Sequence, residues 1–263
     1  MAKKLIPEDH ALLLAKFGEY KWIKKLRDGE VSFSCPGKYI YLAQRYHNDE
    51  QGDENEAIFA RLRKGDIRIN HAANKLNNDL EIIDDGKYVK LRRKSSCRVP
   101  VFCFYSIIGS DLLRNVTHTG LQDLPHHFDN KIFTSFAQKQ ITNVLNNDHI
   151  FTSLFIQPRP FIFLLTKALF RKKYGFRMGR INYTEFERDE FYIEPSKDRN
   201  ELFYKFPRYY YQQEVRICLP AEQLDDIDNR LNIHMQKLAD EDMPMIEKTK
   251  ISLTVKLDIG RKQ

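Results

Sequence analysis

The sequence has few of the residues that interrupt regular structure. Its 263 residues include only 11 glycines and 10 prolines, while the hydrophobic fraction is 42%. Long disordered segments have the opposite composition, so we expect a folded chain with a substantial hydrophobic core. This length allows one large domain or two small ones. Because no feature of the sequence marks a boundary, we predict a single α+β domain over residues 1–263.

Long apolar runs are missing as well. Residues 1–10 contain two lysines and no apolar stretch, so we expect no signal peptide. The most apolar segment, residues 150–170, is interrupted by the Gln-Pro-Arg-Pro sequence at 157–160. Neither half reaches the ~20 apolar residues that a membrane-spanning helix needs. We therefore predict that the protein has no membrane partner.

Common metal-binding and catalytic patterns are also absent. The four cysteines are Cys35, Cys97, Cys103 and Cys218. No pair of them has metal-ligand spacing, which favours reduced thiols in a cytoplasmic protein. The motifs GxGxxG, GxxxxGK[ST], HExxH and GxSxG do not occur. Their absence removes the commonest dinucleotide-binding, NTPase, zinc-peptidase and hydrolase interpretations.

Two groups of residues could still supply metal ligands. Asp53 and Glu56, in the acidic loop 46–57, would share one face of a helix and offer hard oxygen ligands to a divalent cation. Their spacing matches no EF-hand loop, which favours a structural or substrate-gating role for the loop. His126 and His127 are adjacent, and adjacent loop histidines seldom bind one metal. We therefore predict no metal site.

Basic residues are in modest excess. Lysine plus arginine number 43 against 36 acidic residues, which gives a net charge of +7 and a pI of about 9.1. This balance favours a polyanionic partner such as nucleic acid. Two basic runs with interspersed aromatic residues, 87–98 and 171–180, could hold phosphates and stack bases, or could be a solvated hairpin and helix end. The candidate nucleic-acid contacts are Lys90, Arg92, Arg93 and Lys94.

Hydrophobic periodicity predicts many strands and a few interspersed helices. The expected helices are Lys21–Asp28, Asp129–Leu145, one that begins at Pro160, and one near Asp228–Leu238. The expected strands include Glu30–Ser34, short strands in 58–94 with a hairpin turn at Asp84–Lys87, Val99–Ser106, Ser153–Gln157, Gly179–Phe186 and Lys250–Ile259. No regular βαβ rhythm occurs. The pattern predicts an α+β fold with a mixed, mostly antiparallel sheet.

The segment Tyr209–Leu219, YYYQQEVRICL, alternates as a strand would. Val215, Ile217 and Leu219 would form an apolar row on one face, while Gln212, Glu214 and Arg216 would lie side by side on the other face. An amide, a carboxylate and a guanidinium in a row fit two interpretations. They are either an ordinary solvated strand face or the floor of a functional site.

Two stretches together resemble known proteins. Residues 12–40, LLLAKFGEYKWIKKLRDGEVSFSCPGKYI, followed by GDENEA at 52–57, resemble the N-terminal signature of a large group of bacterial proteins of unknown function. Those proteins also carry a late Y..Q.EfRI.l strand, which YYYQQEVRICL matches. The resemblance runs with gaps from Leu12 to Ile259. This layout is similar to the ADP-ribosyltransferase fold, especially its DarT-like branch.

The resemblance implies specific roles for several residues. Glu214 would be the catalytic glutamate, and Gln212 would orient the acceptor. The early strand that holds NAD in that family would lie at Lys16 and Phe17, where the family's arginine or histidine is not found. Lys16 or Arg27 would then bind NAD, and Arg216 would bind a phosphate or position the carboxylate. A toxin or phage-defence role is the setting that the resemblance implies.

Three functional hypotheses therefore stay open. The first is an NAD-dependent ADP-ribosyltransferase-like enzyme that acts on nucleic acid, in which Glu214 stabilises the oxocarbenium character of a reacting ribose. The second is a non-catalytic module that binds nucleic acid or nucleotides through the basic hairpin. The third is a metal-dependent nuclease built on Asp53, Glu56 and Glu214.

Overall fold

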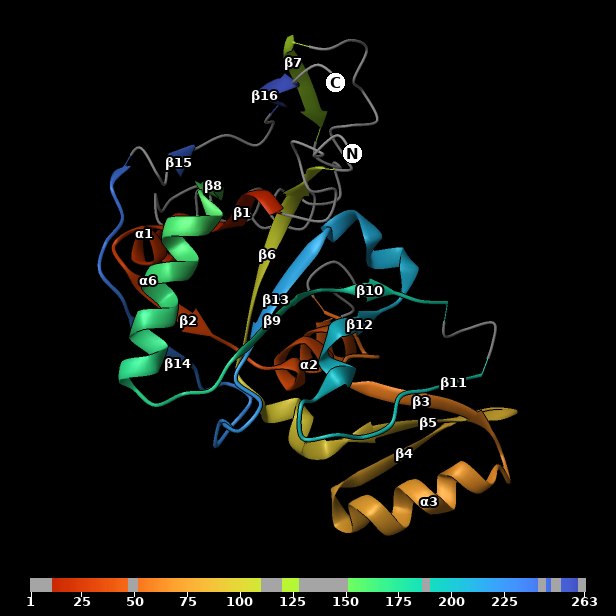
Figure 1. Ribbon diagram of the computed structural model, residues 1–263. Coiled ribbons are helices and arrows are strands. Elements are labelled where there is room, and N and C mark those ends of the chain that lie inside the picture. Colours follow the sequence, from red (N-terminus) through yellow and green to blue (C-terminus); the bar gives the residue numbers. More distant parts are fainter. Residues whose placement is uncertain are drawn as a thin grey trace, which may run out of the picture. The chain divides into compact units, whose positions relative to one another are not determined.

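The computed structural model describes residues 11–46, 52–109, 120–127, 151–185, 190–240, 245–246 and 252–259 (Figure 1). The described chain combines helices with strands, and most of its strand pairs are antiparallel. The α+β class and the mostly antiparallel pairing are therefore confirmed. The predicted helix Asp129–Leu145 lies outside the described residues.

Internal contacts divide the chain into two compact units. Unit 1 comprises residues 1–29, 104–165 and 236–263, and unit 2 comprises residues 30–103 and 166–235. The chain thus passes from one unit to the other four times. Each unit is assembled from segments distant in the sequence, which explains why no linker composition marks a boundary. The single domain over residues 1–263 stays a prediction.

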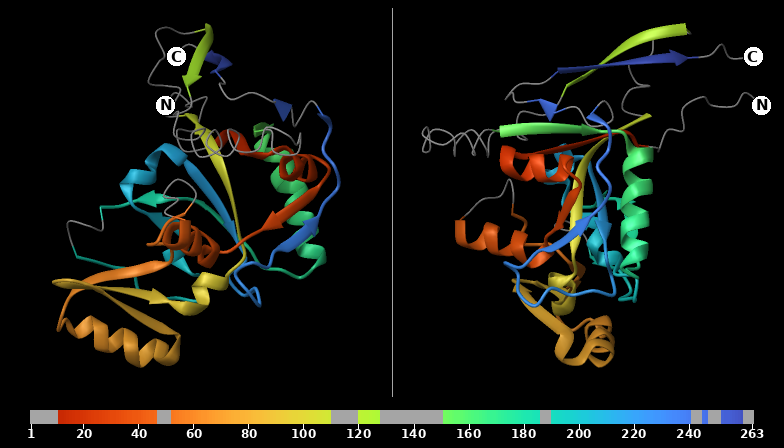
Figure 2. Two further views of the ribbon diagram at one scale, coloured as in Figure 1. Left: turned by 180° about the vertical axis from the view of Figure 1, so that it is seen from behind. Right: turned by 90° about the vertical axis from the view of Figure 1, so that its left-hand side faces the viewer.

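Unit 1 is built on antiparallel strands. Its elements are β1 (Ala11–Glu19), α1 (Tyr20–Arg27), β7 (Gly120–His127), β8 (Phe151–Ile156), β15 (Met245–Ile246) and β16 (Ser252–Ile259), with parts of β6 (Val101–Ile108) and α6 (Pro158–Arg171). Strand β1 lies between β6 and β8, and β15 pairs with β8. Strands β7 and β16 form a separate two-stranded ribbon (Figure 2). The predicted strands at β8 and β16 are confirmed.

Helix α1 shows how local sequence sets an element's limits. It ends before Gly29, whose φ of 97° is open to glycine and strained for other residues, so the predicted stop is confirmed. A helix over these residues places Trp22, Ile23 and Leu26 on one face. Ile23 and Leu26 are buried, whereas Trp22 is 41% exposed, so it lies at the edge of the buried face. The ammonium group of Lys25 lies 5.1 Å from the centre of the Trp22 ring, which gives the indole a polar neighbour at the surface.

Helix α6 begins at Pro158, two residues before the predicted Pro160. Proline at the start of a helix costs little because the first backbone N–H groups have no helical partner. The helical spacing of apolar residues predicts five inward side chains, of which Phe161, Leu165, Ala168 and Leu169 are buried and Leu164 is only partly buried. The Phe161 ring meets the Phe104 ring edge to face, with 5.1 Å between the centroids. The amphipathic pattern of α6 is thus confirmed.

Unit 2 contains the larger number of short elements. They are β2 (Glu30–Phe33), α2 (Pro36–Tyr46), β3 (Ile58–Arg63), α3 (Ile67–Leu76), η1 (Asn77–Asp79), β4 (Leu80–Asp85), β5 (Tyr88–Arg93), η2 (Lys94–Arg98), β9 (Arg177–Arg180), β10 (Asn182–Tyr183), β11 (Phe191–Tyr192), η4 (Asn200–Phe203), β12 (Tyr204–Lys205), η5 (Pro207–Gln212), β13 (Glu214–Cys218) and β14 (Leu231–His234).

An antiparallel sheet in the order β11-β3-β5-β4 forms one part of unit 2. The predicted hairpin turn is confirmed, and Gly86 in that turn has a φ of 68°. Helix α3 packs on this sheet, as Figures 1 and 2 show, and its Ala72 is fully buried with Phe59, Leu62 and Leu91. Elsewhere in the unit, β2 pairs with β14, β13 pairs with β9, and β10 pairs with β12 in parallel.

Several sequence predictions in unit 2 are wrong. Pro36 opens helix α2, which was not among the expected helices, because proline suits a first helical position. The residues of helix α3 were expected to form a strand. Instead, the Asp66 carboxylate accepts a hydrogen bond from the Arg68 backbone N–H and so caps the start of the helix. The helix predicted near Asp228–Leu238 is strand β14, in which Ile233 pairs with Val31. In residues 231–234 alternate side chains are buried or partly buried as in a strand, although the apolar residues of this segment also fit a helical spacing.

Candidate active site

The strand predicted over Tyr209–Leu219 begins later than expected, at Glu214. Residues Pro207–Gln212 form the 3-10 helix η5, with proline in its first turn. Gln213 then has a φ of 40°, which ends the helical turn. The strand prediction for residues 209–213 is therefore wrong, because proline and a left-handed residue set the backbone there.

Both faces of β13 are buried. Val215, Ile217 and Leu219 are 3%, 1% and 0% exposed, so the predicted apolar row is confirmed. Glu214 and Arg216 share the opposite face as predicted, and they are 5% and 0% exposed. Neither the solvated face nor an open site floor describes this arrangement. Burying a carboxylate and a guanidinium is costly unless each has ionic and hydrogen-bond partners.

Glu214 has cationic partners on both carboxylate oxygens. Arg216 Nε donates to Oε1 at 2.8 Å. Lys205 Nζ, from β12, donates to Oε2 at 2.7 Å. The Cys103 thiol adds a hydrogen bond to the same carboxylate. Charge-assisted hydrogen bonds of this length are the strong class, so the carboxylate is held in one orientation.

Arg216 also forms a two-pronged pair with Glu56. Its Nη1 and Nη2 donate to the two Glu56 oxygens at 2.9 and 2.8 Å, and Nη1 also donates to the Leu202 carbonyl at 2.7 Å. Lys205 Nζ lies 3.3 Å from Glu56 Oε1. We call these four side chains the ion network: Glu56, Lys205, Glu214 and Arg216. It contains two carboxylates and two cations, so its formal charges cancel.

Electrostatic interactions keep Glu214, Lys205 and Arg216 charged. Burial alone would raise the pKa of Glu214, but the attraction of Arg216 and Lys205 outweighs it and holds the pKa well below its usual range. Burial alone would likewise lower the pKa of Lys205, yet Glu214 and Glu56 hold it well above normal. The pKa of Arg216 is raised for the same reason. Glu214 is therefore a carboxylate throughout the neutral range.

Polar side chains from neighbouring segments surround the network. Gln212 Oε1 accepts a hydrogen bond from Lys205 Nζ at 3.0 Å, so this predicted site residue does lie beside Glu214. Tyr183 Oη accepts the backbone N–H of Glu214 at 2.9 Å. Burial, with the nearby Glu214 charge, raises the pKa of Tyr183 above its usual range, and burial also raises the pKa of Tyr39. Both phenols therefore stay protonated.

Asp53 is a second buried carboxyl group next to the network. It is 2% exposed, and its Oδ1 accepts the Asn55 backbone N–H at 2.9 Å. Its Oδ2 has no hydrogen-bond partner within the described part of the chain. Burial, and then the Glu56 charge, raise the pKa of Asp53 to about 6. The segment expected to be a polar loop thus brings Asp53 and Glu56 into the interior.

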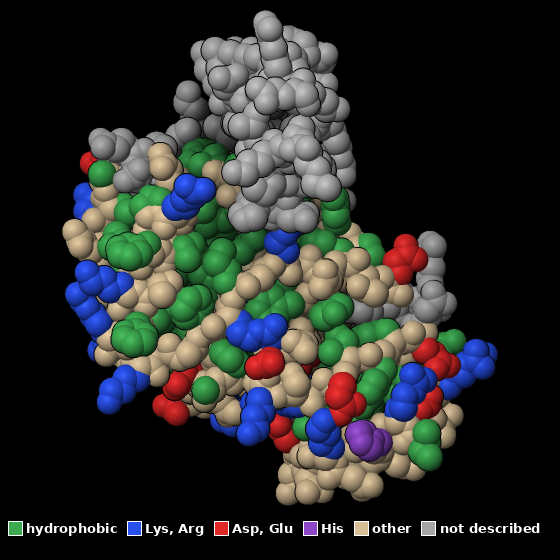
Figure 3. All heavy atoms as spheres, viewed as in Figure 1, with side chains coloured by type: hydrophobic (Ala, Val, Ile, Leu, Met, Phe, Trp, Pro, Cys, Tyr) green, Lys and Arg blue, Asp and Glu red, His purple; other side chains and the backbone are tan. Residues whose placement is uncertain are grey.

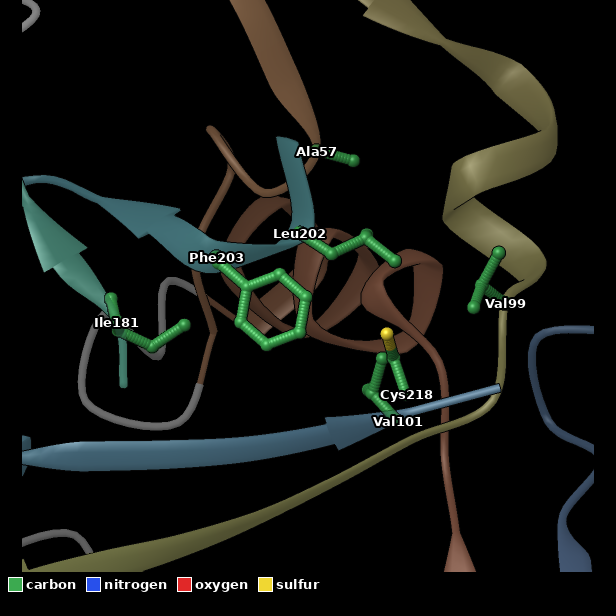
Figure 4. Close-up of a cluster of buried hydrophobic side chains, with 7 residues drawn as sticks. All are labelled: Ala57, Val99, Val101, Ile181, Leu202, Phe203 and Cys218. Atoms are coloured by element: carbon green, nitrogen blue, oxygen red, sulfur yellow. The ribbon is translucent and has the colours of Figure 1, made fainter. Parts of the chain in front are cut away.

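Apolar packing encloses part of this region. Cys218, two residues after Arg216 on β13, belongs to a buried hydrophobic cluster that Figure 4 shows. Leu202 and Phe203 of η4 fill its centre, and the Leu202 carbonyl is the one that Arg216 binds. The remaining members are Ala57, Val99, Val101 and Ile181. Such packing excludes water and strengthens each ionic contact beside it.

The two predicted NAD-binding residues other than Arg216 belong to unit 1. Lys16 lies on β1, opposite Leu154 of β8. Arg27 ends α1 and pairs with Asp240, with 3.0 Å between Nη2 and Oδ2. Glu214, Gln212 and Arg216 all belong to unit 2. The NAD-binding role of Lys16 and Arg27 stays a prediction.

The predicted basic hairpin is largely turned inward. Arg92 is 4% exposed, and its guanidinium donates to the backbone carbonyls of Glu54 and Glu56 and to the Glu81 carboxylate. Arg93 is 6% exposed and donates to the Ser196 carbonyl at 2.8 Å. Lys90 lies 3.6 Å from Asp85, and Lys94 binds the Asn78 carbonyl at 3.0 Å. Phosphate contact by these four residues stays a prediction, but Arg92 and Arg93 already have protein acceptors.

Sequence reasoning missed Lys205 and gave Glu56 a different role. Lys205 stands alone between Tyr204 and Phe206, and a single lysine inside an aromatic run is a pattern that could have pointed to a buried cation. Glu56 was considered only as a metal ligand. In the structure, Lys205 and Arg216 lie between the carboxylates that the nuclease hypothesis needs. Among the described residues, no group of three or more His, Cys, Asp or Glu side chains could hold a metal ion.

Comparisons with known proteins add no further constraint. No protein-family model, no curated protein and no solved structure matches this chain. No helix within the described ranges has the length and apolar character needed to span a bilayer.

Proposed function

We propose that this chain is an NAD-dependent ADP-ribosyltransferase-like enzyme that acts on nucleic acid, with Glu214 as the residue that stabilises the reacting ribose. One observation carries the proposal. The Glu214 carboxylate is kept ionised in a site that excludes water, between Arg216 and Lys205. A charge that is pre-oriented and poorly solvated stabilises a developing opposite charge far better than a solvated one.

The chemistry needs such a group. When the bond between nicotinamide and ribose breaks, nicotinamide leaves with the bonding electron pair and the ribose carbon gains positive charge. A carboxylate that accepts hydrogen bonds from ribose hydroxyls stabilises that charge, as in glycoside cleavage. The acceptor nucleophile then forms the new bond to the same carbon and releases a proton. Gln212, which shares Lys205 with Glu214, would orient the acceptor.

Of the two cations bound to Glu214, Lys205 is the one that would move when the substrate binds. Arg216 is held by Glu56 through two hydrogen bonds and by the Leu202 carbonyl, so it cannot move without breaking several contacts. Lys205 is a flexible ammonium that donates to Gln212 as well as to Glu214. Substrate binding would therefore draw Lys205 from Glu214 Oε2 and leave that oxygen for a ribose hydroxyl.

The test compares Glu214→Gln with a matched control, Glu201→Gln. Glu201 is also fully buried in unit 2, where its Oε1 accepts from Ser96 Oγ at 2.7 Å and lies 3.6 Å from Arg93. Both changes remove one buried negative charge and preserve shape. We expect Glu214→Gln to lower nicotinamide release by roughly 10²–10³-fold, as loss of a transition-state stabiliser does elsewhere. Glu201→Gln should lower the melting temperature and leave the rate of the folded fraction unchanged.

Two results would contradict the catalytic role. Equal rates for Glu214→Gln and Glu201→Gln, each corrected for folded fraction, would assign Glu214 to structure. Absence of nicotinamide release by the unmodified protein, with single-stranded DNA and RNA both present, would remove the NAD chemistry itself.

A further inference from the structure

The excess positive charge of this protein is concentrated in one segment. Between Asp148 and Glu185 the sequence contains no acidic residue. The same segment contains seven lysines and arginines, and seven is also the net charge of the whole chain, 43 minus 36. The rest of the sequence is therefore balanced. The seven cations are Arg159, Lys167, Arg171, Lys172, Lys173, Arg177 and Arg180.

Helix α6 presents part of this charge to solvent together with two aromatic rings. Phe163 and Phe170 are 66% and 82% exposed, and a seven-residue spacing places them on the same side of the helix. Lys167 lies between them on that side and is exposed, as are Arg159 and Arg171. Figure 3 shows apolar side chains bordered by lysine and arginine over this part of the molecule. Two exposed phenylalanines on one helix side are unusual unless they meet a partner.

The cations of this surface lack carboxylate partners among the described residues, whereas the hairpin cations have protein oxygens as partners. Lys167, Arg171, Lys172 and Lys173 form no ion pair with any carboxylate in the described part of the chain. Residues 171–173 are all exposed. Arg171 ends the helix, and Lys172 and Lys173 follow it directly. Two of the four hairpin cations, by contrast, are buried against protein oxygens. The basic run 171–180 is thus the better placed of the two runs to meet phosphates.

The shape of this surface favours single-stranded nucleic acid over a lipid bilayer. A helix that lies in a membrane interface buries a continuous apolar face, but the apolar face of α6 already packs inside the protein. What is exposed is two isolated rings among cations, separated along the axis by about 10 Å. Unpaired bases stack on such rings while lysine and arginine follow the phosphates. A base-paired duplex offers no exposed base face for these rings.

We propose that the outer side of α6 and the basic segment 171–173 form a binding surface for single-stranded nucleic acid. The choice of nucleic acid as the polyanion rests on the proposed function, for which this surface would hold the acceptor strand. Phosphates contact Lys167 and residues 171–173, and Phe170 stacks on a base. Binding requires no NAD and no contribution from Glu214.

The test measures binding of fluorescent single-stranded oligonucleotides by anisotropy, without NAD, over a series of salt concentrations. The variant Lys167→Gln/Lys172→Gln/Lys173→Gln should reduce the slope of log K against log salt by about 2, since each lost phosphate contact on a single strand lowers it by ~0.7. Phe170→Ala should weaken binding by roughly 5- to 150-fold with little change of slope.

The matched control is Lys64→Gln/Lys75→Gln/Lys87→Gln. It removes the same charge from exposed lysines of unit 2, and Lys64 and Lys75 pair with Asp84 and Glu194 there. This control should leave affinity and slope close to those of the unmodified protein. Equal losses in both triple variants would overturn the proposal, because the effect would then be one of total charge.

Four further results separate the alternatives. No effect of Phe170→Ala, with duplex and single strand bound equally, would overturn the stacking surface. Sedimentation with vesicles of anionic lipid, without binding to oligonucleotides, would overturn it in favour of a membrane surface. Oligonucleotide binding that survives in Glu214→Gln supports the surface independently of catalysis. Nicotinamide release by a protein that binds no oligonucleotide would support the enzyme and overturn the surface.

Discussion

Two groups of basic residues in unit 2 have similar sequence surroundings and opposite environments. Arg92, Arg93 and Arg216 are buried, and each binds carbonyl or carboxylate oxygens of the protein. Residues 171–173 are exposed and have no described carboxylate partner. Both groups lie next to aromatic and apolar residues. The difference teaches that a basic run indicates a polyanion surface only when the fold supplies no internal acceptors for it.

The largest expected effect concerns Glu56. In Glu56→Ala, Arg216 stays buried but loses both oxygens of its two-pronged partner, so we expect stability to fall by about 3–5 kcal/mol. The control is Glu54→Ala, an exposed residue of the same turn, which should cost less than ~0.5 kcal/mol. Urea denaturation measures the loss of stability in each of the two variants. A loss below 1 kcal/mol in Glu56→Ala would mean that Arg216 finds another acceptor.

A pH-dependent effect of intermediate size should come from Asp53. Its pKa is about 6 in the folded protein, against an ordinary value of 3.8. Because the folded-state pKa is raised, the favourable contribution is complete below the ordinary pKa and is lost as pH rises through 6. Stability should therefore decrease from pH 5 to pH 7.5, by about 1.4 kcal/mol from this group, because pH 5 lies about one unit below the folded-state pKa. Glu214, whose pKa is lowered in the folded protein, is ionised there over this range and is mostly ionised in the unfolded chain at pH 5, so it adds little slope.

Asp53→Asn isolates that contribution. The amide cannot ionise, so the variant should be more stable than the unmodified protein at pH 7.5, and its melting temperature should change less between pH 5 and 7.5. Asp66→Asn serves as the comparison, because the Arg68 guanidinium and backbone N–H lower the pKa of Asp66 to about 2. Replacement of Asp66 should leave the change of melting temperature between pH 5 and 7.5 as it is in the unmodified protein. An unaltered slope in Asp53→Asn would place the pH dependence elsewhere.

A smaller contrast is expected within the hairpin. Arg93→Gln removes a donor from the Ser196 carbonyl and a cation 3.6 Å from the buried Glu201, and should cost about 1–3 kcal/mol. Lys94→Gln changes an exposed side chain that binds the Asn78 carbonyl, and should cost less than ~0.5 kcal/mol. Thermal denaturation distinguishes the two. Equal costs would contradict the division into buried and exposed basic residues.

The smallest effect on stability should come from the α6 surface. Lys167→Gln/Lys172→Gln/Lys173→Gln removes exposed charges without described partners, so the melting temperature should change little. The same variant is expected to change nucleic-acid binding strongly. A marked loss of stability would show that these cations serve the fold, for example through the negative end of the helix dipole at the end of α6.

Much of the secondary structure could be predicted because its causes are local. Alternation predicted the buried row of Val215, Ile217 and Leu219, and Asp84–Lys87 predicted a hairpin turn. The helices α2 and α3 were missed because their apolar spacing is weak, and Pro36 and Asp66 were not recognised as helix starts. Proline and aspartate occur both in turns and at helix starts, and only the packing of the following residues decides between the two.

Part of the candidate site was also within reach of the sequence. A period of two predicted that Glu214 and Arg216 share a face, and their hydrogen bond confirms it. Their other partners were out of reach. Glu56 precedes Arg216 by 160 residues, and Lys205 lies on a separate short strand. No local rule connects residues at such separations.

The sequence by itself determined the strand alternation of β13, the amphipathic pattern of α6 and the placement of all net positive charge between Asp148 and Glu185. These follow from backbone geometry and from composition, which act over a few residues. Only the tertiary structure decided that Arg216 is buried and that residues 171–173 are exposed. A charge can leave water only where oxygen acceptors meet it within hydrogen-bond distance, and those acceptors come from distant parts of the chain.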